Sequence, residues 1–225
     1  MKYKLIGEVM PAVEIVMNRG DSMYTQSGGM AWMSQDMEMT TNARGGVMKG
    51  LGRMFSGESF FMTTYTARSD DSVIGFSATV PGEILPVDLT SGGPLICQKG
   101  VFLCAEQTVH TKVAFTKKLS AGLFGGEGFI LQEVAGSGMA FLEIDGNRIE
   151  KTLQSGESLL VDTGNLVAFE PTVSYEIQMV KGGVNLFLGG EGLFLTRLTG
   201  PGRVVLQTQN FGEFAGRINK FLPKS

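Results

Sequence analysis

The strongest constraint on the fold of this chain is a segment that occurs three times along the sequence. Residues 56–62 (SGESFFM) recur as 125–131 (GGEGFIL) and again as 189–195 (GGEGLFL). Each copy contains a Gly-Glu pair and continues into an apolar run. Self-similarity at a nearly fixed spacing is the signature of an internally repeated fold.

A second landmark recurs in register with the first. It is a glycine followed three residues later by an apolar residue and eight residues later by another glycine. The three copies start at Gly20, Gly92 and Gly156. Two landmarks in the same order in three copies indicate repeats of about 65 to 70 residues.

The landmarks divide the chain into three repeats and a tail. Glycine makes up 32 of the 225 residues, about twice its usual share, because the same turns are made three times and turns use glycine for positive φ. We predict one compact pseudo-threefold body made of β repeats at 1–82, 83–147 and 148–214, with a C-terminal helix and tail at 211–225.

Within each repeat the residues alternate with the period of a β-strand. After the apolar run, one side of the predicted strand is polar and the other is apolar. The polar positions are Thr64, Glu133 and Arg197, and the apolar positions are Tyr65, Val134 and Leu198. Turn residues and a second apolar run follow, so we predict a β-hairpin there and another at the earlier glycine landmark. The predicted fold class is therefore all-β, with β-sandwich-like units.

Only the C-terminal tail has a helical period. Its apolar residues fall on one face of a helix, and Pro223 follows as a stop signal. These residues are Phe211, Phe214, Ile218, Phe221 and Leu222. We predict a short amphipathic helix that covers the β structure or a neighbouring subunit.

The single histidine excludes several reaction classes. His110 is the only imidazole of the chain, so zinc or iron sites made from two or three histidines cannot form within one chain. No Gly-x-Ser-x-Gly nucleophile motif accompanies it. Its β-branched neighbours favour an ordinary position on a strand.

Other motifs with chemical meaning are equally sparse. Cys97 and Cys104 flank a predicted turn at Lys99-Gly100, and their spacing fits neither a zinc ribbon nor a thioredoxin motif. Two buried free thiols are therefore expected. No complete GxGxxG or P-loop sequence occurs. We predict no catalytic residue set and no cofactor.

Charge and hydropathy argue against two classes of partner. The formal net charge is −3, which disfavours broad attraction to nucleic acid or to an anionic membrane, although a local basic patch remains compatible with it. No apolar run is long enough to span a bilayer, and Glu8 stands where a secretory signal would be apolar. We predict a cytoplasmic protein.

Several of these segments carry a family resemblance. Residues 53–62, 189–195, 198–202, 206–207 and 215–223 resemble the prokaryote-type members of the "altered inheritance of mitochondria" family over nearly the whole chain. The resemblance implies double-stranded β-helix units similar to the trp RNA-binding attenuation protein, repeated in one chain and assembled into a ring or trimer. It implies no catalytic residue and no substrate.

Three glutamates occupy the same place in the three copies and form the first candidate site. Around a pseudo-threefold axis, Glu58, Glu127 and Glu191 would converge on a cation such as Ca²⁺ or raise one another's pKa by repulsion. Alternatively, each glutamate accepts backbone N–H bonds within its own repeat. The sequence favours this second interpretation, so we predict no metal.

The segments before each Gly-Glu pair are the second candidate site. Each joins basic residues to glycines and apolar residues, and three of them on one face would form a cationic rim with apolar tips, suited to a membrane surface or a protein partner. Alternatively, the apolar side chains fold back over the barrel or pack between subunits, and the glycine-rich sequence favours this for them. The candidate partner-binding residues are Lys49, Arg53, Phe55, Lys118, Phe124, Lys181 and Phe187.

The function predicted from these observations is that of a non-enzymatic oligomeric β scaffold that binds a protein or a membrane surface through the repeated segments. The alternative is a small-molecule or cation-binding β-barrel enzyme that uses Glu127 or Glu191 as an acid or base. A shortage of convergent polar groups tells against the enzyme. RNA binding follows from fold analogy alone, and the sequence lacks the interleaved aromatic and basic residues of stacking platforms.

Overall fold

The computed structural model describes residues 1–26, 28–43, 61–117, 129–179, 194–219 and 221–222. The described chain is predominantly β, with antiparallel strand pairs and one short C-terminal helix, which confirms the predicted all-β class. It divides into two compact units. Unit 1 comprises Met1–Pro94, Gly100–Lys112 and Val134–Ile144, and unit 2 comprises Leu95–Lys99, Val113–Glu133 and Asp145–Ser225.

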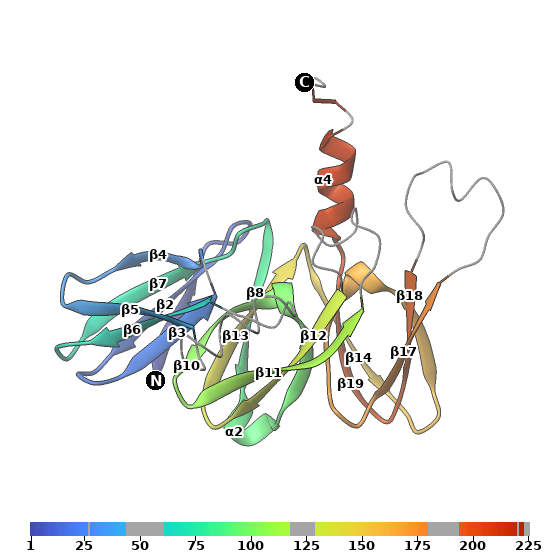
Figure 1. Ribbon diagram of the computed structural model, residues 1–225, viewed down its shortest axis with the longest axis horizontal. Helices are drawn as coiled ribbons and strands as arrows, with labels where there is room; N and C mark the ends of the chain where they lie inside the picture. Colours follow the sequence, from blue (N-terminus) through green and yellow to red (C-terminus); the bar gives the residue numbers. More distant parts are fainter. Residues whose placement is uncertain (27, 44–60, 118–128, 180–193, 220, 223–225) are drawn as a thin grey trace. The chain divides into compact units, whose positions relative to one another are not determined.

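Unit 1 contains a four-stranded and a six-stranded sheet. The four-stranded sheet has the order β1 (Lys2–Ile6), β2 (Ala12–Met17), β7 (Ser72–Ser77), β4 (Met30–Met33). The six-stranded sheet has the order β5 (Met37–Ala43), β6 (Phe61–Ala67), β3 (Ser22–Gln26), β10 (Phe102–Glu106), β13 (Met139–Asp145), β8 (Gly82–Asp88). Figure 1 shows β2, β4 and β7 in one layer and β3, β5 and β6 in the other.

The two sheets of unit 1 share one hydrophobic core. Ile15 on β2 and Phe76 on β7 are fully buried, as is Phe141 on β13. The rings of Tyr65 and Phe76 meet edge to face, with centroids 6.0 Å apart, and so join the two sheets. Burial of apolar side chains between two sheets is the main stabilising contribution in a sandwich of this kind.

Unit 2 repeats this arrangement with a six-stranded and a three-stranded sheet. The six-stranded sheet has the order β11 (Val109–Lys117), β12 (Phe129–Gly136), β9 (Leu95–Gln98), β16 (Leu166–Phe169), β19 (Gly202–Gln207), β14 (Arg148–Leu153). The three-stranded sheet has the order β15 (Ser158–Asp162), β18 (Phe194–Thr199), β17 (Ser174–Met179). The shared core includes Leu131, Phe169 and Leu198, and the rings of Phe169 and Tyr175 lie 5.3 Å apart across it.

The predicted alternation of polar and apolar residues is confirmed in all three copies. Tyr65, Val134 and Leu198 are buried. Their neighbours Thr64 and Glu133 are half-buried, and Arg197 is exposed. The apolar side of each strand therefore faces a core, as the period of two requires.

The predicted hairpin after each apolar run is wrong. Strands β6 and β7 follow one another in the chain but lie in different sheets, and the same is true of β12 and β13 and of β18 and β19. The predicted hairpin at the earlier glycine landmark is wrong as well, because β2 and β3 lie in different sheets. Turn residues reverse the chain at these places, but their chemistry does not determine whether the returning strand pairs with the outgoing one or crosses to the facing sheet.

Short helices interrupt the strands at a few points. They are α2 (Leu89–Gly92), η1 (Lys99–Val101), η2 (Thr163–Asn165) and α4 (Phe211–Asn219). The predicted C-terminal helix is thus present as α4 in unit 2. Its first turn is bonded to the unit, because the Phe211 N–H donates to Asp145 Oδ2 at 3.2 Å and the Glu213 N–H to Asn210 Oδ1 at 3.3 Å.

Gly75 in β7 provides the space in which the side chain of Trp32, the only tryptophan of the sequence, lies. A Cβ atom at Gly75 would lie 2.1 Å from Cε2 of Trp32, so the indole lies directly over the glycine backbone. The indole N–H donates to Glu14 Oε2 at 3.1 Å, and Glu14 also pairs with Lys4 at 2.7 Å. The Lys4 bond lowers the pKa of the Glu14 carboxyl.

We expect Gly75→Ala to displace the Trp32 ring. Overpacking of this kind costs about 1 kcal/mol or more of unfolding free energy, and the indole should become more exposed, which shifts its fluorescence emission to the red. Denaturant unfolding and emission spectra would measure both effects. Gly100→Ala is the matched control, since no atom lies within 4 Å of its added Cβ; unchanged emission in Gly75→Ala would contradict the expectation.

Candidate functional site

The residues proposed from the sequence as binding residues lie outside the described part of the chain. This holds for the glutamates Glu58, Glu127 and Glu191 and for the partner-binding candidates Lys49, Arg53, Phe55, Lys118, Phe124, Lys181 and Phe187. The described strands that lead into and out of these segments define where the segments begin and end.

Each of the three segments joins two strands that are neighbours in one sheet. Segment 44–60 joins β5 to β6, segment 118–128 joins β11 to β12, and segment 180–193 joins β17 to β18. Figure 1 shows β17 and β18 side by side in their sheet. Consecutive strands therefore pair with one another at these three places, as β1 and β2 also do, and not at the predicted hairpins.

Strand pairing continues to the last described residue on each side of two segments. Ala43 is the cross-strand partner of Phe61, and Met179 is the cross-strand partner of Phe194. Directly opposed residues of an antiparallel pair have Cα atoms about 4.5 to 5.5 Å apart. The described residues that flank segment 44–60 therefore lie next to one another in a sheet, and so do those that flank segment 180–193.

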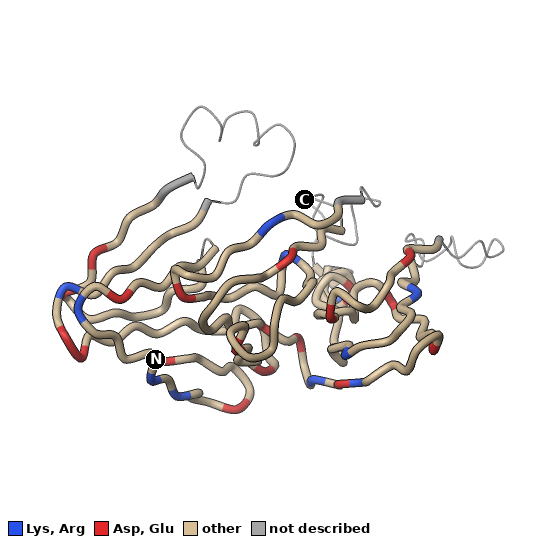
Figure 2. Tube along the Cα trace, turned by 90° about the horizontal axis from the view of Figure 1, so that it is seen from below, with Lys and Arg blue, Asp and Glu red and all other residues tan. Residues whose placement is uncertain are grey.

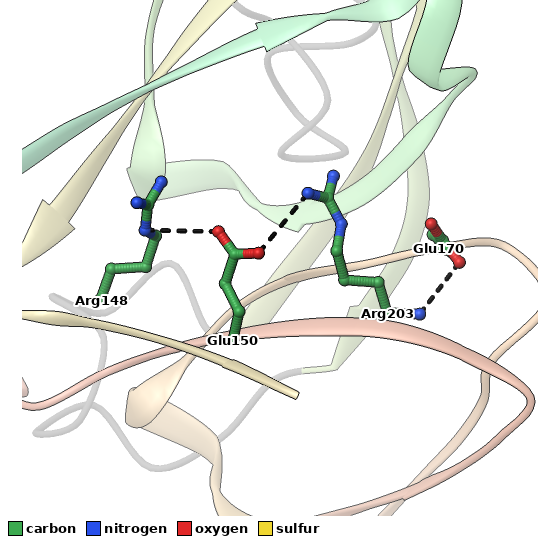
Figure 3. A network of polar contacts seen from close by, with 4 residues as sticks. All are labelled: Arg148, Glu150, Glu170 and Arg203. Atoms are coloured by element: carbon green, nitrogen blue, oxygen red, sulfur yellow. Dashed lines mark hydrogen bonds and ion pairs between the residues drawn. The ribbon is translucent and has the colours of Figure 1, made fainter. Parts of the chain in front are cut away.

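Four charged residues of unit 2 form a network of polar contacts. Glu150 on β14 accepts from Arg148 at 3.3 Å and faces Arg203 on β19 at 3.7 Å (Figure 3). The Arg203 backbone N–H donates to Glu170 at 2.9 Å. Figure 2 shows basic and acidic residues interspersed along the described trace. Such partly exposed pairs contribute about 0 to 1 kcal/mol each, and they balance the charge of one another.

A buried carboxylate in unit 1 has a structural partner. Glu143 on β13 is 7% exposed, and its carboxylate accepts from the backbone N–H of Thr79 and from Thr79 Oγ1, the latter at 2.8 Å. Burial raises the pKa of this carboxyl, and the two bonds from Thr79 oppose the rise. The sequence signal for this site is a single charged residue, Glu143, inside the apolar strand 139–144. It belongs to none of the repeated motifs.

The cysteines lie where the sequence predicted them to be, buried and free. Burial raises the pKa of the Cys97 thiol to about 12 and raises the pKa of Cys104 well above its usual value. In unit 2, Gln132 Nε2 donates to Cys97 Sγ at 3.8 Å and to the Lys99 carbonyl at 3.5 Å. Thiols in this state are poor nucleophiles, because the thiolate is the reactive form.

His110 lies on β11 and is exposed, which confirms the predicted strand position. Among the described residues, no group of three or more His, Cys, Asp or Glu side chains is placed to hold a metal ion. Within the same part of the chain, no helix has the length and apolar character needed to cross a membrane.

Helix α4 presents an apolar face to solvent. Phe211, Phe214 and Ile218 are 48%, 45% and 44% exposed, although each is large and apolar. The rings of Phe211 and Phe214 lie 6.5 Å apart and so belong to one cluster. Among the residues that the structure describes, this is the apolar cluster expected from the helical period of the tail, and its side chains are not covered by unit 2.

Comparison with known proteins identifies relatives over the whole fold. The sequence profile of the family described as Mitochondrial biogenesis AIM24 matches residues 3–209. An uncharacterised protein of Streptococcus pyogenes serotype M6 is 30% identical over 224 residues, which cover 96% of this chain and 88% of that protein. The crystal structure of protein SPYM3_0169 from Streptococcus pyogenes matches with a TM-score of 0.79 at 24% identity, covering 98% of this chain and 99% of that one.

We expect the buried Glu143 to make stability depend on pH. Because its pKa is raised in the folded protein, the folded state holds this proton more tightly than the unfolded chain. That contribution is complete below the ordinary carboxyl pKa and is lost as the pH rises through the raised pKa. Denaturant unfolding between about pH 4 and about pH 8 should show wild type losing stability relative to Glu143→Gln as the pH rises.

The control for that experiment is Glu8→Gln, which removes one carboxylate at an exposed position. A stability difference between wild type and Glu143→Gln that stays constant over the whole pH range would contradict the expectation.

We expect the two thiols to be inert in the folded protein. Ellman's reagent near pH 8, close to the pKa of a free thiol, should leave the native protein unmodified and should detect both cysteines after unfolding in urea. The reason is burial, which withholds both access and ionisation. Rapid labelling of either cysteine in the native protein would show that the strands carrying it open easily.

Proposed function

The chain belongs to the family described as Mitochondrial biogenesis AIM24, and from this starting point we propose that it is a non-enzymatic β scaffold that assembles with copies of itself and binds a protein or a membrane surface. The binding elements in this proposal are segments 44–60, 118–128 and 180–193. The observation that carries it is the position of these segments, each joining two neighbouring strands of a sheet.

The proposal includes a threefold repeat of six strands: β2 to β7, β8 to β13, and β14 to β19. The order of strands in the sheets supports it. In each set the first and third strands adjoin the sixth, and the second and fourth adjoin the fifth. Each set also alternates between two sheets at every step except from the fourth strand to the fifth. Such alternation is typical of double-sheet folds of the jelly-roll kind and supports double-stranded β-helix units similar to the trp RNA-binding attenuation protein.

In this scheme the three segments are equivalent, because each connects the fourth strand of its set to the fifth. Their composition is shared as well: basic residues such as Lys49, Lys118 and Lys181 occur with phenylalanines such as Phe55 and Phe187. Cationic and apolar groups together suit the surface of an anionic bilayer or an acidic, partly apolar protein surface. The local positive charge acts over about 10 Å at ordinary salt, so a net charge of −3 on the chain does not prevent it.

The exposed face of α4 supports the same class of function. Monomeric soluble proteins rarely leave clustered large apolar side chains in solvent, and such clusters mark sites of association. Phe211, Phe214 and Ile218 form one of them. On a scaffold, this face can pack against a partner. A β domain that works alone would be expected to bury these side chains or to carry polar residues in their place.

We expect the protein to float with vesicles that contain anionic lipid at low salt, and to release them as salt is raised. A variant with Lys49, Lys118 and Lys181 all changed to Glu should bind at least about tenfold more weakly, since each cation near an anionic surface contributes about 1 kcal/mol. Vesicle flotation measures both effects.

The matched control carries Lys2, Lys112 and Lys151 changed to Glu, because these lysines are exposed on described strands outside the three segments. If wild type stays unbound to vesicles, affinity capture from the native cells with both triple variants tests the protein-partner form of the proposal. Equal capture by wild type and by the segment variant would reject the segments as the binding elements.

A further inference from the structure

In the part of the chain that the structure describes, two strands at sheet edges expose apolar side chains and have no further strand paired to that edge. Strand β4 ends the four-stranded sheet of unit 1, and β15 ends the three-stranded sheet of unit 2. Their sequences are MAWM and SLLVD, with no proline and no lysine. Natural edge strands are normally blunted by such residues or by a covering element, because a bare edge is a template for pairing with another strand.

The two six-stranded sheets show how the strands equivalent to β4 and β15 are paired in the other repeats. In unit 1, β3 pairs with β10, and in unit 2, β9 pairs with β16. Strands β3, β9 and β15 are the second strands of the three sets proposed above, and β4, β10 and β16 are the third strands. Each internal junction therefore joins the second strand of one set to the third strand of the next. By this rule β15 and β4 are the two strands left without that neighbour.

The register of the two internal junctions is the same. Cys104 lies opposite Thr25, and Ala168 lies opposite Cys97. Thr25 and Cys97 each stand five residues after a landmark glycine, Gly20 or Gly92. The corresponding residue of β15 is Val161, five residues after Gly156.

The third strands also correspond residue by residue, because each contains the same irregularity. The register shifts between Phe102 and Cys104 in β10, and between Leu166 and Ala168 in β16. In β4 it shifts between Met30 and Trp32. Trp32 therefore occupies the place of Cys104 and Ala168, and Met33 occupies the place of Ala105 and Phe169.

The apolar residues on the edge strands β4 and β15 are far more exposed than their equivalents at the β3–β10 and β9–β16 junctions. Leu160 is 50% exposed, and Trp32 and Met33 are 38% exposed. The corresponding residues at the internal junctions are Tyr24, Ile96, Cys104, Ala105, Ala168 and Phe169, and all of these are between 0% and 8% exposed. The edge residues are thus apolar at positions that the other two copies bury.

We propose that β4 of one copy of this chain pairs antiparallel with β15 of a second copy, with Trp32 opposite Val161 and Met33 opposite Leu160. The inference rests on the three sets of six strands in the proposed function, and it names a second copy of the chain as the partner of the two edge strands. It joins the three-stranded and four-stranded sheets into one sheet in the order β17, β18, β15, β4, β7, β2, β1. The first six of these strands match the order of the two six-stranded sheets, and β1 is an additional strand beyond β2. Because the two surfaces differ, the contact is head to tail, and it propagates until a ring closes.

The register is tested by disulfide trapping between two chains that each carry one new cysteine. Met33→Cys and Leu160→Cys place the thiols on directly opposed residues. Their Cβ atoms, about 4.5 to 5.5 Å apart in an antiparallel pair, lie close to the separation of about 3.5 to 4.5 Å that a disulfide needs. Oxidation of the mixed chains should give a linked species of twice the 24.1 kDa chain mass that contains one of each. The native cysteines are buried.

The register control pairs Met33→Cys with Ser158→Cys, two residues away on the same strand, where the diagonal separation of about 7 to 8 Å prevents a rapid disulfide. Equal trapping in both mixtures, or in neither, would overturn the proposed register. In a double variant, Met33→Cys with Leu160→Cys in one chain, a ladder of covalent oligomers is expected. A bond formed within a single chain would place the pairing inside the monomer and reject a second copy as the partner.

A second measurement does not depend on oxidation. Leu160→Lys places a charge at the proposed junction, and light scattering should then report the mass of a single chain while wild type is larger. Trp32 is the only tryptophan, so its emission should shift to the red in the same variant. Ile149→Lys is the control, since Ile149 is 41% exposed on β14, outside the junction. A wild-type protein that is monomeric by light scattering would overturn the proposal, whatever the flotation of the three segments shows.

Discussion

Within each of the two units, the structure depends on backbone pairing between strands that are distant in the sequence. In unit 1, Thr25 on β3 faces Thr63 on β6 on one side and Cys104 on β10 on the other. Buried N–H and C=O groups must be paired, so a strand that leaves one sheet at a tight turn has to find a complete partner in the next. In the described residues, α4 and a few single turns satisfy backbone groups locally, whereas the other elements are strands paired within sheets. The shared cores, the positions of the three segments and the two bare edges all follow from this long-range pairing.

The local features of the fold could be predicted from the sequence because their causes are local. A period of two placed Tyr65, Val134 and Leu198 on buried faces, and a period of 3.6 placed Phe211, Phe214 and Ile218 on one face of α4. The partners of the strands could not be predicted in this way. Glycine and aspartate turns such as that at Asp71, with φ of 58°, reverse a chain equally well within a sheet or between two sheets. The choice is made by packing against residues far away in the sequence.

The candidate site shows the same division. Repetition drew attention to segments 44–60, 118–128 and 180–193, and the strand order supports their equivalence. Sequence reasoning missed the edges, because MAWM and SLLVD have the composition of ordinary buried strands. Trp32 and Leu160 become unusual only when the strand order shows that, among the described strands, none pairs beyond them. Glu143 was missed for a similar reason, since its partner Thr79 belongs to a distant part of the sequence.

Edge pairing and segment binding strengthen one another on physical grounds. A basic and apolar segment of this length binds a surface weakly by itself, and a net charge of −3 gives no general attraction to reinforce it. Linking several weak sites in one assembly makes every contact after the first intramolecular, and the gain in avidity reaches about 10² to 10⁴ when the geometry allows simultaneous contact. Three segments in each chain, multiplied by head-to-tail pairing of β4 with β15, provide such a set of sites. The same pairing covers residues such as Leu160, which is 50% exposed in a single chain, so one contact both buries apolar surface and multiplies the binding segments.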